Sequence, residues 1–270
     1  MNNWHFEIDK KSLINEYTYF CKVPGELSIK SRRNLIVKYF QQDTFFKTEK
    51  MLLNNDEIRS KIIKNRMKYL HKDEDNLTIL DILQGFKRSG IYFGYSHFNP
   101  LLFKWFINKF NSKICYDPCG GWGHRLLGSN ELQLYIYNDL SYHTYENVNR
   151  IIDFFNIQNV KTFNNDAYIF EPEYDYDSMF TCPPYFNVEK YECNDFIDID
   201  EYNLFIESLF VAFERKNSCN TFGLVIREDM LDESIKHYAK HSYILSNATA
   251  KHINSGNEHK NLEILYIFKK

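Results

Sequence analysis

Hydrophobic and polar positions follow two different rhythms before and after about residue 100. In the first part, apolar residues such as Ile58, Ile62 and Met67 recur at helical spacing while Lys and Arg fill the opposite side. In the second part, short apolar runs alternate with longer amphipathic stretches. The sequence therefore predicts a helical N-terminal region over 1–90 and an α/β domain over 91–270.

The second part is typical of an open, mostly parallel sheet with helices on both faces. Seven strands are expected, at 113–117, 134–139, 159–163, 176–181 and 221–226 and in the runs SYILSNA and LEILYIFK. Helices are expected at 101–110, 141–155, 201–216 and 229–240, and a glycine-rich turn together with a helix is expected over 118–129. We expect the last two strands to form a hairpin at the edge of the sheet.

Charge is distributed unevenly along the chain. Residues 1–90 contain 17 Lys and Arg against 12 Asp and Glu, a balance of +5, and the remainder contains 16 against 24, a balance of −8. A basic segment joined to an acidic body often contacts phosphate. The N-terminal region is therefore a candidate for contact with nucleic acid.

Two further features bear on compartment and metals. No run approaches the roughly 18 apolar residues of a membrane span, and the N-terminus has acidic residues where a signal peptide is apolar, so we expect a cytoplasmic protein without membrane contact. The six cysteines include no Cys-x-x-Cys pair, which favours reduced thiols. His237 and His241 have the spacing of a helical metal pair but lack a His-Glu-x-x-His pattern, so we expect a solvated helix face and no metal site.

A glycine-rich segment follows the first predicted strand. The strand KICYD runs into Pro118-Cys119-Gly120-Gly121-Trp122-Gly123 and then a helix. Glycines allow a tight turn and close approach of a ligand, and a helix N-terminus offers free N–H groups. Asp139 ends the next strand, 18 residues beyond Gly121, where an acidic residue accepts hydrogen bonds from ribose. Because Asp117 would repel a pyrophosphate and attract an ammonium group, S-adenosylmethionine suits this pattern.

The segment FTCPPYF follows the fourth predicted strand, which would lie beside the first. Ligands in such sheets bind at the carboxyl ends of strands where the order reverses. Pro183 and Pro184 have a fixed φ and no N–H, and each extends the residue before it, so the segment presents a stiff edge of carbonyl acceptors. Such acceptors can orient the amino group of a nucleobase, on which Tyr185 can stack.

Together these motifs resemble those of the S-adenosylmethionine-dependent DNA amino-methyltransferases. Residues 117–123 look like the family's Asp-Pro-Phe-x-Gly-x-Gly cofactor loop, and Cys182-Pro183-Pro184-Tyr185 looks like its catalytic Asp/Asn/Ser-Pro-Pro-Tyr/Phe element. Ser96-His97-Phe98-Asn99-Pro100 is similar to a short element that helps to hold the methionine end. The segments GWGHRLLG and CPPYF are similar to those of phage-like and prokaryotic members, and the resemblance covers about 88–270.

The resemblance implies a Rossmann-like methyltransferase fold, S-adenosylmethionine as cofactor, no metal, and a flipped adenine or cytosine in DNA as target. Asp117 would contact the methionine amino group, Asp139 the ribose and Asp166 the adenine of the cofactor. The full implied cofactor set is Asp117, Pro118, Cys119, Gly121, Gly123, Asp139, Asp166, Asn99 and Pro100. The implied catalytic set is Cys182, Pro183, Pro184 and Tyr185. Candidate DNA contacts are Phe186, Asn187, Arg59, Lys61, Lys64, Arg66 and Lys68, with target recognition expected from the N-terminal region and from loops 186–200 and 250–260.

Two positions depart from the family pattern. Cys119 replaces an aromatic residue, and Cys182 stands where the family has Asp, Asn or Ser. Sulfur is a weak acceptor, so the Pro183 carbonyl or Thr181 would assist, and the choice between adenine and cytosine stays open.

Other activities stay open as well. They are methylation at pyrimidine carbon 5 through a covalent cysteine adduct, an RNA substrate, methylation of protein glutamine, and a methyltransferase fold that only binds DNA or a partner. The oligomeric state, the target sequence and any partner nuclease of a restriction-modification system are also open.

Overall fold

The chain forms two compact units in a computed structural model, which describes residues 8–30, 33–45, 54–78, 81–82, 85–86, 97–186, 196–249 and 260–270. The helical unit comprises 1–14 and 34–96, and the sheet unit comprises 15–33 and 97–270. This division differs from the expected single boundary after residue 90, because residues 15–33 belong with the sheet.

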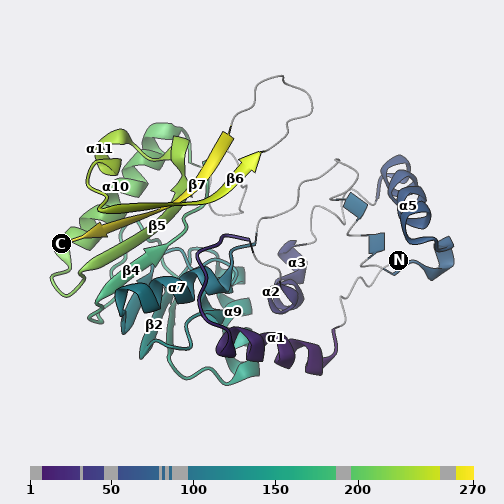
Figure 1. The fold of residues 1–270 in the computed structure, drawn as a ribbon, viewed down its shortest axis with the longest axis horizontal. Helices are drawn as coiled ribbons and strands as arrows, with labels where there is room; N and C mark the ends of the chain where they lie inside the picture. Colours follow the sequence, from purple (N-terminus) through teal and green to yellow (C-terminus); the bar gives the residue numbers. More distant parts are fainter. Residues whose placement is uncertain are drawn as a thin grey trace. The chain divides into compact units, whose positions relative to one another are not determined.

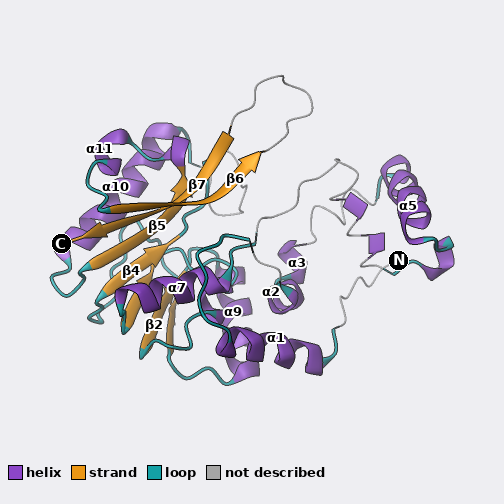
Figure 2. Ribbon diagram, viewed as in Figure 1, coloured by secondary structure: helices purple, strands orange, loops and turns teal. Residues whose placement is uncertain are grey.

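The sheet unit contains seven strands in the order β3-β2-β1-β4-β5-β7-β6 (Figures 1 and 2). The five strands β1 to β5 run parallel, β7 is antiparallel to β5, and β6 pairs with β7 at the edge. Their bounds are β1 Ile114–Asp117, β2 Leu134–Asn138, β3 Val160–Phe163, β4 Ser178–Thr181, β5 Thr221–Arg227, β6 His241–Thr249 and β7 Lys260–Lys269. The Rossmann-like α/β fold, the seven strands and the terminal hairpin predicted from the sequence are confirmed.

Helices follow the strands much as the hydrophobic pattern predicts, and side-chain caps fix where several of them begin. Ser141 accepts a hydrogen bond from the backbone of Thr144 at the start of α9, and Asp198 accepts one from Glu201 at the start of α10. The bounds are α7 Pro100–Phe110, α8 His124–Leu127, α9 Tyr142–Phe155, α10 Ile199–Arg215 and α11 Glu233–Lys236.

The helix predicted over 229–240 is wrong in extent. A 3-10 turn (Glu228–Met230) precedes α11, and Leu231 between them is extended. The Asp232 side chain accepts a hydrogen bond from the Ser234 backbone and begins a new helix there, so the two pieces are not continuous. His237 follows α11 as its C-cap and His241 begins β6, and both are exposed, so they share no helix face.

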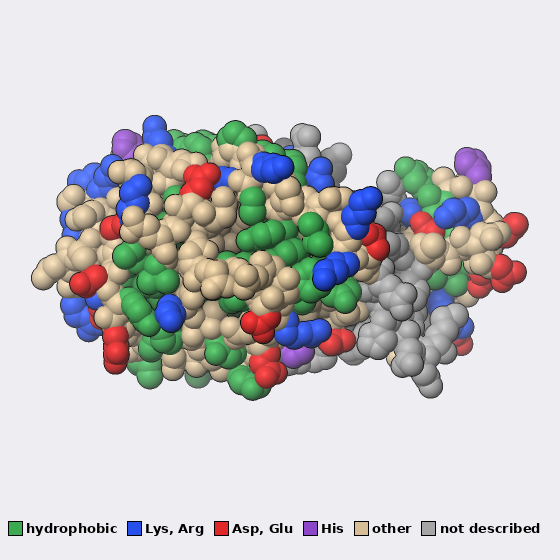
Figure 3. Space-filling view, turned by 90° about the horizontal axis from the view of Figure 1, so that it is seen from below, with side chains coloured by type: hydrophobic (Ala, Val, Ile, Leu, Met, Phe, Trp, Pro, Cys, Tyr) green, Lys and Arg blue, Asp and Glu red, His purple; other side chains and the backbone are tan. Residues whose placement is uncertain are grey.

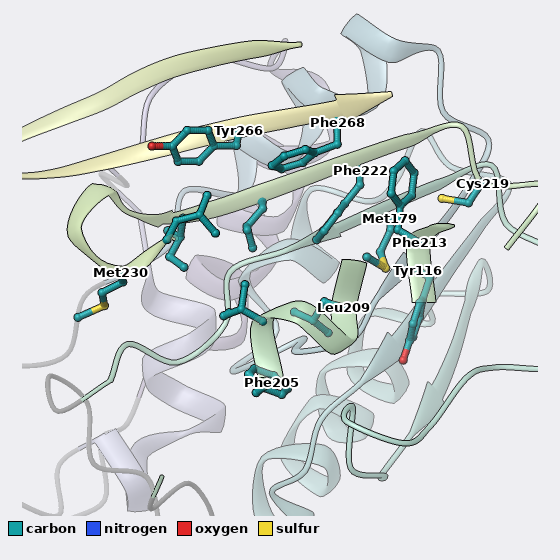
Figure 4. Close-up of a cluster of buried hydrophobic side chains, with 14 of the residues drawn as sticks. Tyr116, Met179, Phe205, Leu209, Phe213, Cys219, Phe222, Met230, Tyr266 and Phe268 are labelled. Carbon is teal, nitrogen blue, oxygen red and sulfur yellow. The ribbon is translucent and has the colours of Figure 1, made fainter. Parts of the chain in front are cut away.

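The core lies on both faces of the central strands. Successive residues of a strand point to opposite faces, so Met179 of β4 joins the cluster under α10 shown in Figure 4, whereas Phe180 packs against Phe103 and Phe106 of α7. Gly223 of β5 makes room for the second group, because a Cβ there would lie 2.6 Å from the Phe180 ring. Both faces of the sheet are therefore covered.

Residues 15–33 cover the α7 side of the sheet unit. The Glu26 backbone N–H donates to the Leu101 carbonyl (2.9 Å). The Lys104 ammonium, 1% exposed, donates to the Phe20 carbonyl (3.0 Å) and pairs with Glu131 (3.1 Å). This segment therefore supplies carbonyl acceptors to a buried ammonium of α7, whose charge Glu131 neutralises.

The helical unit holds shorter elements and one long helix. Its described helices are α2 Leu35–Phe40, α3 Gln42–Phe45, α5 Asp56–Leu70 and the 3-10 turn Glu74–Asn76, and α1 (Lys10–Lys22) extends from this unit into the sheet unit. The pattern of ILDILQGFKRSG also predicts a short helix over 79–90, and most of this segment lies outside the described residues. None of the described helices has the length and apolar content that a membrane crossing requires.

Candidate functional site

The two sequence motifs meet at one edge of the sheet. Strands β1 and β4 are adjacent and parallel, with Tyr116 opposite Met179, so the loops that follow them leave from the same edge. The Thr181 hydroxyl at the end of β4 donates to Asp117 Oδ1 at the end of β1 (3.1 Å). The predicted neighbourhood of the two segments is confirmed. We call residues 118–123 the glycine bend and residues 182–186 the proline loop.

The glycine bend depends on three glycines for different reasons. Gly121 and Gly123 have positive φ values of 60° and 89°, which other residues rarely adopt. Gly120 packs on Tyr137, whose ring would lie 2.0 Å from an added Cβ. A Cβ on Gly121 would instead meet no atom closer than Arg125 Nη2 at 4.0 Å. The bend therefore has an open side at Gly121, where a ligand can approach the backbone.

Asp139 ties the end of β2 to the glycine bend. Its Oδ2 accepts from the Gly121 backbone N–H (2.8 Å) and its Oδ1 accepts from Ser141 N–H (3.0 Å). Burial outweighs these hydrogen bonds and raises the pKa of Asp139 to about 6. Each carboxylate oxygen keeps a further lone pair, so Asp139 can also accept hydrogen bonds from a ligand hydroxyl.

Asp117 is the centre of a buried polar network. The carboxylate is 0% exposed and accepts from Arg125 Nε (2.5 Å), from the Tyr135 hydroxyl (2.6 Å) and from Thr181. The resemblance implies a ligand ammonium at this position, but here the chain supplies its own cation. Contact between Asp117 and the cofactor stays a prediction.

Arg125 is a site residue that the sequence reasoning missed. Its guanidinium also donates to the Cys119 carbonyl and lies 5.0 Å from the centre of the Phe98 ring. Burial disfavours the charge of Arg125, but the Asp117 carboxylate more than offsets this, and the pKa of Arg125 is raised. Arg125 thus holds the glycine bend and the end of β1 together. The available signal was a basic residue in the short helix directly after the bend.

The remaining predicted cofactor residues lie around the same bend. The Asn138 amide donates to the carbonyls of Pro118 and Asn165 (both 3.0 Å), which joins the bend to the loop after β3. Asp166 in that loop is exposed, and its Oδ1 accepts from Tyr168 N–H (2.9 Å). Asp166 is therefore accessible at the same edge as Asp139.

Asn99 and Pro100 are buried at the start of α7. The Asn99 side chain caps the helix at Leu101 N–H and donates to Glu26 Oε1 (2.8 Å), so its described contacts are structural. His97, two residues earlier, lies with its Nδ1 3.1 Å from His124 Nε2. Burial, together with neighbouring Arg125, lowers the pKa of His124 to about 3, so this histidine is neutral.

The proline loop is partly buried. Pro183 is buried, and Cys182, Pro184 and Phe186 are half-buried. Tyr185 is only 7% exposed, and its hydroxyl donates to Glu263 Oε1 on β7 (3.0 Å). The ring therefore packs in the core in this conformation, and its stacking on a base stays a prediction.

The contacts of Thr181 and Cys182 bear on the expectation that Thr181 assists Cys182. The Thr181 hydroxyl points to Asp117, so it is engaged away from the proline loop. The Cys182 sulfur lies 3.9 Å from the Tyr185 hydroxyl. Asn187 and the loop over 250–259 lie outside the described residues, as does Cys193, while the other five cysteines are free thiols.

Arg66, expected to contact phosphate, is buried in α5. It is 2% exposed, and its guanidinium lies 3.9 Å from Asp81. The expectation fails because Arg66 shares the buried face of the helix. Arg59 forms an ion pair with Asp56 (2.7 Å), whereas Lys64 and Lys68 are exposed.

No protein-family model matches the sequence, and a search of curated proteins finds no match. Solved structures with a similar fold include human methyltransferase 10 domain containing protein (10% identity, 58% of this chain and 71% of that chain, TM-score 0.42). TrmN from Thermus thermophilus is 13% identical over 63% of this chain and 48% of that chain, with a TM-score of 0.43. An rRNA methylase from Streptococcus thermophilus is 7% identical over 58% of this chain and 86% of that chain, with a TM-score of 0.39. At these identities and TM-scores, the similarity decides neither the activity nor the substrate of this chain.

Proposed function

We propose that the protein transfers a methyl group from S-adenosylmethionine to the exocyclic amino group of adenine or cytosine in DNA. The observation that carries this proposal is the meeting of the glycine bend and the proline loop at adjacent strand ends, joined by the hydrogen bond from Thr181 to Asp117. A methyl donor and an amino acceptor must lie side by side for transfer. Each loop suits one of them.

The residues around the glycine bend fit the cofactor. The open side of Gly121 allows close approach, Asp139 has lone pairs for ribose hydroxyls, and Asp166 is exposed at the next loop. When bound, S-adenosylmethionine supplies a methyl group activated by the sulfonium. Asp117 and Arg125 fix the shape of the bend.

The proline loop suits the amino group. Its prolines offer no N–H that would repel the hydrogens of an amino group, and its carbonyl oxygens can accept them. The amino nitrogen then gains the methyl carbon, the carbon–sulfur bond breaks, and one amino proton leaves to solvent. The Cys182 thiol accepts hydrogen bonds more weakly than Asp, Asn or Ser, so the backbone carbonyl of Pro183 carries this contact.

Methyl incorporation from labelled S-adenosylmethionine into unmethylated DNA tests the proposal. We expect incorporation with the wild type and none with the Pro184→Ala, Tyr185→Ala double variant. Tyr238→Ala is the matched control, because Tyr238 is 71% exposed and lies at the end of α11. Equal incorporation by the wild type and the double variant would remove the catalytic assignment. Mass spectrometry of the product nucleosides identifies the base, and the same assay with RNA decides between the two nucleic acids.

A second candidate function is a binding module without chemistry. It is favoured by the full engagement of Asp117 within the protein and by cysteine at position 182. Calorimetric titration with S-adenosylmethionine separates the two candidates. Measurable binding supports the enzyme, whereas the absence of heat at every concentration supports the module.

A further inference from the structure

Helix α5 of the helical unit has one face that is tightly packed. Ile62, Ile63 and Arg66 are buried on it. Gly85 lies so close that an added Cβ would be 2.7 Å from Ile62 Cγ2. The Asn55 side chain caps the helix by accepting hydrogen bonds from two backbone N–H groups of the first turn. The orientation of α5 in its unit is therefore fixed, and so is the choice of residues that face outward.

The opposite face of α5 carries a row of exposed polar residues. Their spacing of i, i+3, i+4, i+7 and i+8 places them in one stripe. They are Lys61, Lys64, Asn65, Lys68 and Tyr69, all exposed, and we call them the basic stripe. The stripe combines three positive charges with an amide and an aromatic ring that is 56% exposed. This is a set of groups that suits phosphate together with base edges.

Among the residues that the structure describes, no acidic side chain pairs with the lysines of the basic stripe. Basic residues beside the stripe have acidic partners, as in the pairs Arg59 with Asp56 (2.7 Å) and Lys72 with Asp81 (3.0 Å). In contrast, no residue in the described ranges forms an ion pair with a lysine of the stripe. Lys64 and Lys68 stand at i,i+4, where like charges repel. An anionic partner would relieve this repulsion.

The sheet unit offers no comparable row of positive charge on the face shown in Figure 3. There, Lys and Arg side chains are scattered among acidic and hydrophobic ones. Residues 91–270 also carry eight more acidic than basic residues, 24 against 16. The basic stripe is suited to attract a polyanionic substrate.

We propose that the basic stripe lies along the major groove of duplex DNA, with its lysines at phosphates and Asn65 at a base edge. An α-helix about 10–12 Å in diameter fits a groove about 12 Å wide. Lys61 and Lys68 are about 10 Å apart along the helix axis. Asn65 lies between Lys64 and Lys68, and an asparagine can make two hydrogen bonds to an adenine in this groove. The inference rests on the proposed function in taking DNA as the substrate.

Binding of the full-length chain to a short fluorescent DNA duplex, measured by anisotropy over a range of salt concentrations, tests the phosphate contacts. We expect Lys64→Gln, Lys68→Gln to weaken binding roughly tenfold and to reduce the slope of log affinity against log salt by about 1.8, or about 0.9 per lost contact. The control is Lys161→Gln, Lys240→Gln, which removes two exposed lysines of the sheet unit and the same charge. Unchanged affinity in the first variant, or an equal loss in the control, would overturn the inference.

Two further arms test the groove and the base contact. The deep, narrow major groove of duplex RNA excludes a helix. If the Lys64→Gln, Lys68→Gln variant weakened binding to duplex RNA as much as binding to duplex DNA, docking in the major groove would be contradicted. In a pool of duplexes with randomised centres, Asn65→Ala should reduce the preference for adenine at one position roughly tenfold while leaving the salt slope unchanged. An unchanged preference would contradict the role of Asn65.

Measuring methyl incorporation with the same variants separates this inference from the proposed function. If DNA is methylated but the basic stripe does not affect binding, the inference fails and the proposed function stands. If no preparation methylates DNA but the lysine variant loses binding, the proposed function fails and the inference stands.

Discussion

The glycine bend and the proline loop leave the same edge of the sheet, but they are held by different interactions. The bend is fixed by buried polar contacts. Asp139 accepts a hydrogen bond from the Gly121 backbone, and Arg125 donates both to the Cys119 carbonyl and to Asp117. Among the described contacts of the proline loop are the restricted backbone of two prolines and the hydrogen bond from Tyr185 to Glu263. Changes on the bend side should therefore alter folding and pH response, whereas changes on the loop side should mainly alter turnover.

The largest expected effect is on stability and comes from removing the guanidinium of Arg125. Arg125→Met leaves the Asp117 carboxylate, 0% exposed, without its positively charged partner, and we expect a loss of about 3–5 kcal/mol in the free energy of unfolding. Urea denaturation measures it. Tyr135→Phe, which removes one hydrogen bond to the same carboxylate, should cost only about 1 kcal/mol. Similar losses in the two variants would show that the charge pair does not dominate the network.

A smaller effect is expected on cofactor binding. The pKa of Asp139 is about 6, so its carboxylate is charged above that pH and protonated below it. Because a charged acceptor binds hydroxyls more strongly, affinity for S-adenosylmethionine should fall as the pH drops through about 6. Asp139→Asn should weaken binding roughly tenfold at neutral pH and abolish this pH step. Calorimetry at several pH values measures the affinity of the wild type and of the variant. If the affinity of Asp139→Asn still fell near pH 6, a group other than Asp139 would cause the pH dependence.

The smallest effect is expected on the loop side. Tyr185→Phe removes the hydroxyl that donates to Glu263, which should cost about 1 kcal/mol of stability. Glu263→Gln keeps an acceptor for that hydroxyl and should leave stability nearly unchanged. In the methyl transfer assay, the first variant should lower kcat more than it raises KM, and the second should retain most of the activity. A larger loss in Glu263→Gln than in Tyr185→Phe would give the carboxylate a role beyond orienting the ring.

Much of the sheet unit could be predicted because its local signals agree with its fold. The strand around Phe222 is a continuous apolar run, as a parallel strand covered on both faces should be. The positions of the glycine bend and the proline loop follow from strand order alone. The short helix α11 was overestimated because the pattern over 229–240 is amphipathic, and the cap at Asp232 interrupts it.

Other features depend on contacts that a sequence does not display. Helix α1 was not predicted individually, because Glu16 is buried between Leu13 and Phe20 and interrupts the apolar stripe. Arg66 was assigned to solvent because basic residues usually are exposed, whereas Asp81 allows its burial.

The partner of Arg125 could not be derived from spacing alone. Its pairing with Asp117 joins a strand end to a helix eight residues later, across a bend whose path depends on tertiary structure. For the same reason, the burial of Tyr185 was not foreseen, since Glu263 lies on the last strand.

The assignment of residues 15–33 to the sheet unit has a practical consequence for dissecting the protein. The chain crosses between units three times, after residues 14, 33 and 96. Deleting the first 90 residues would strip away the carbonyl groups that hold the Lys104 ammonium, and would leave that charge buried with Glu131 as its remaining described partner. To obtain the sheet unit alone, residues 34–96 are better replaced by a linker, so that residues 15–33 stay attached.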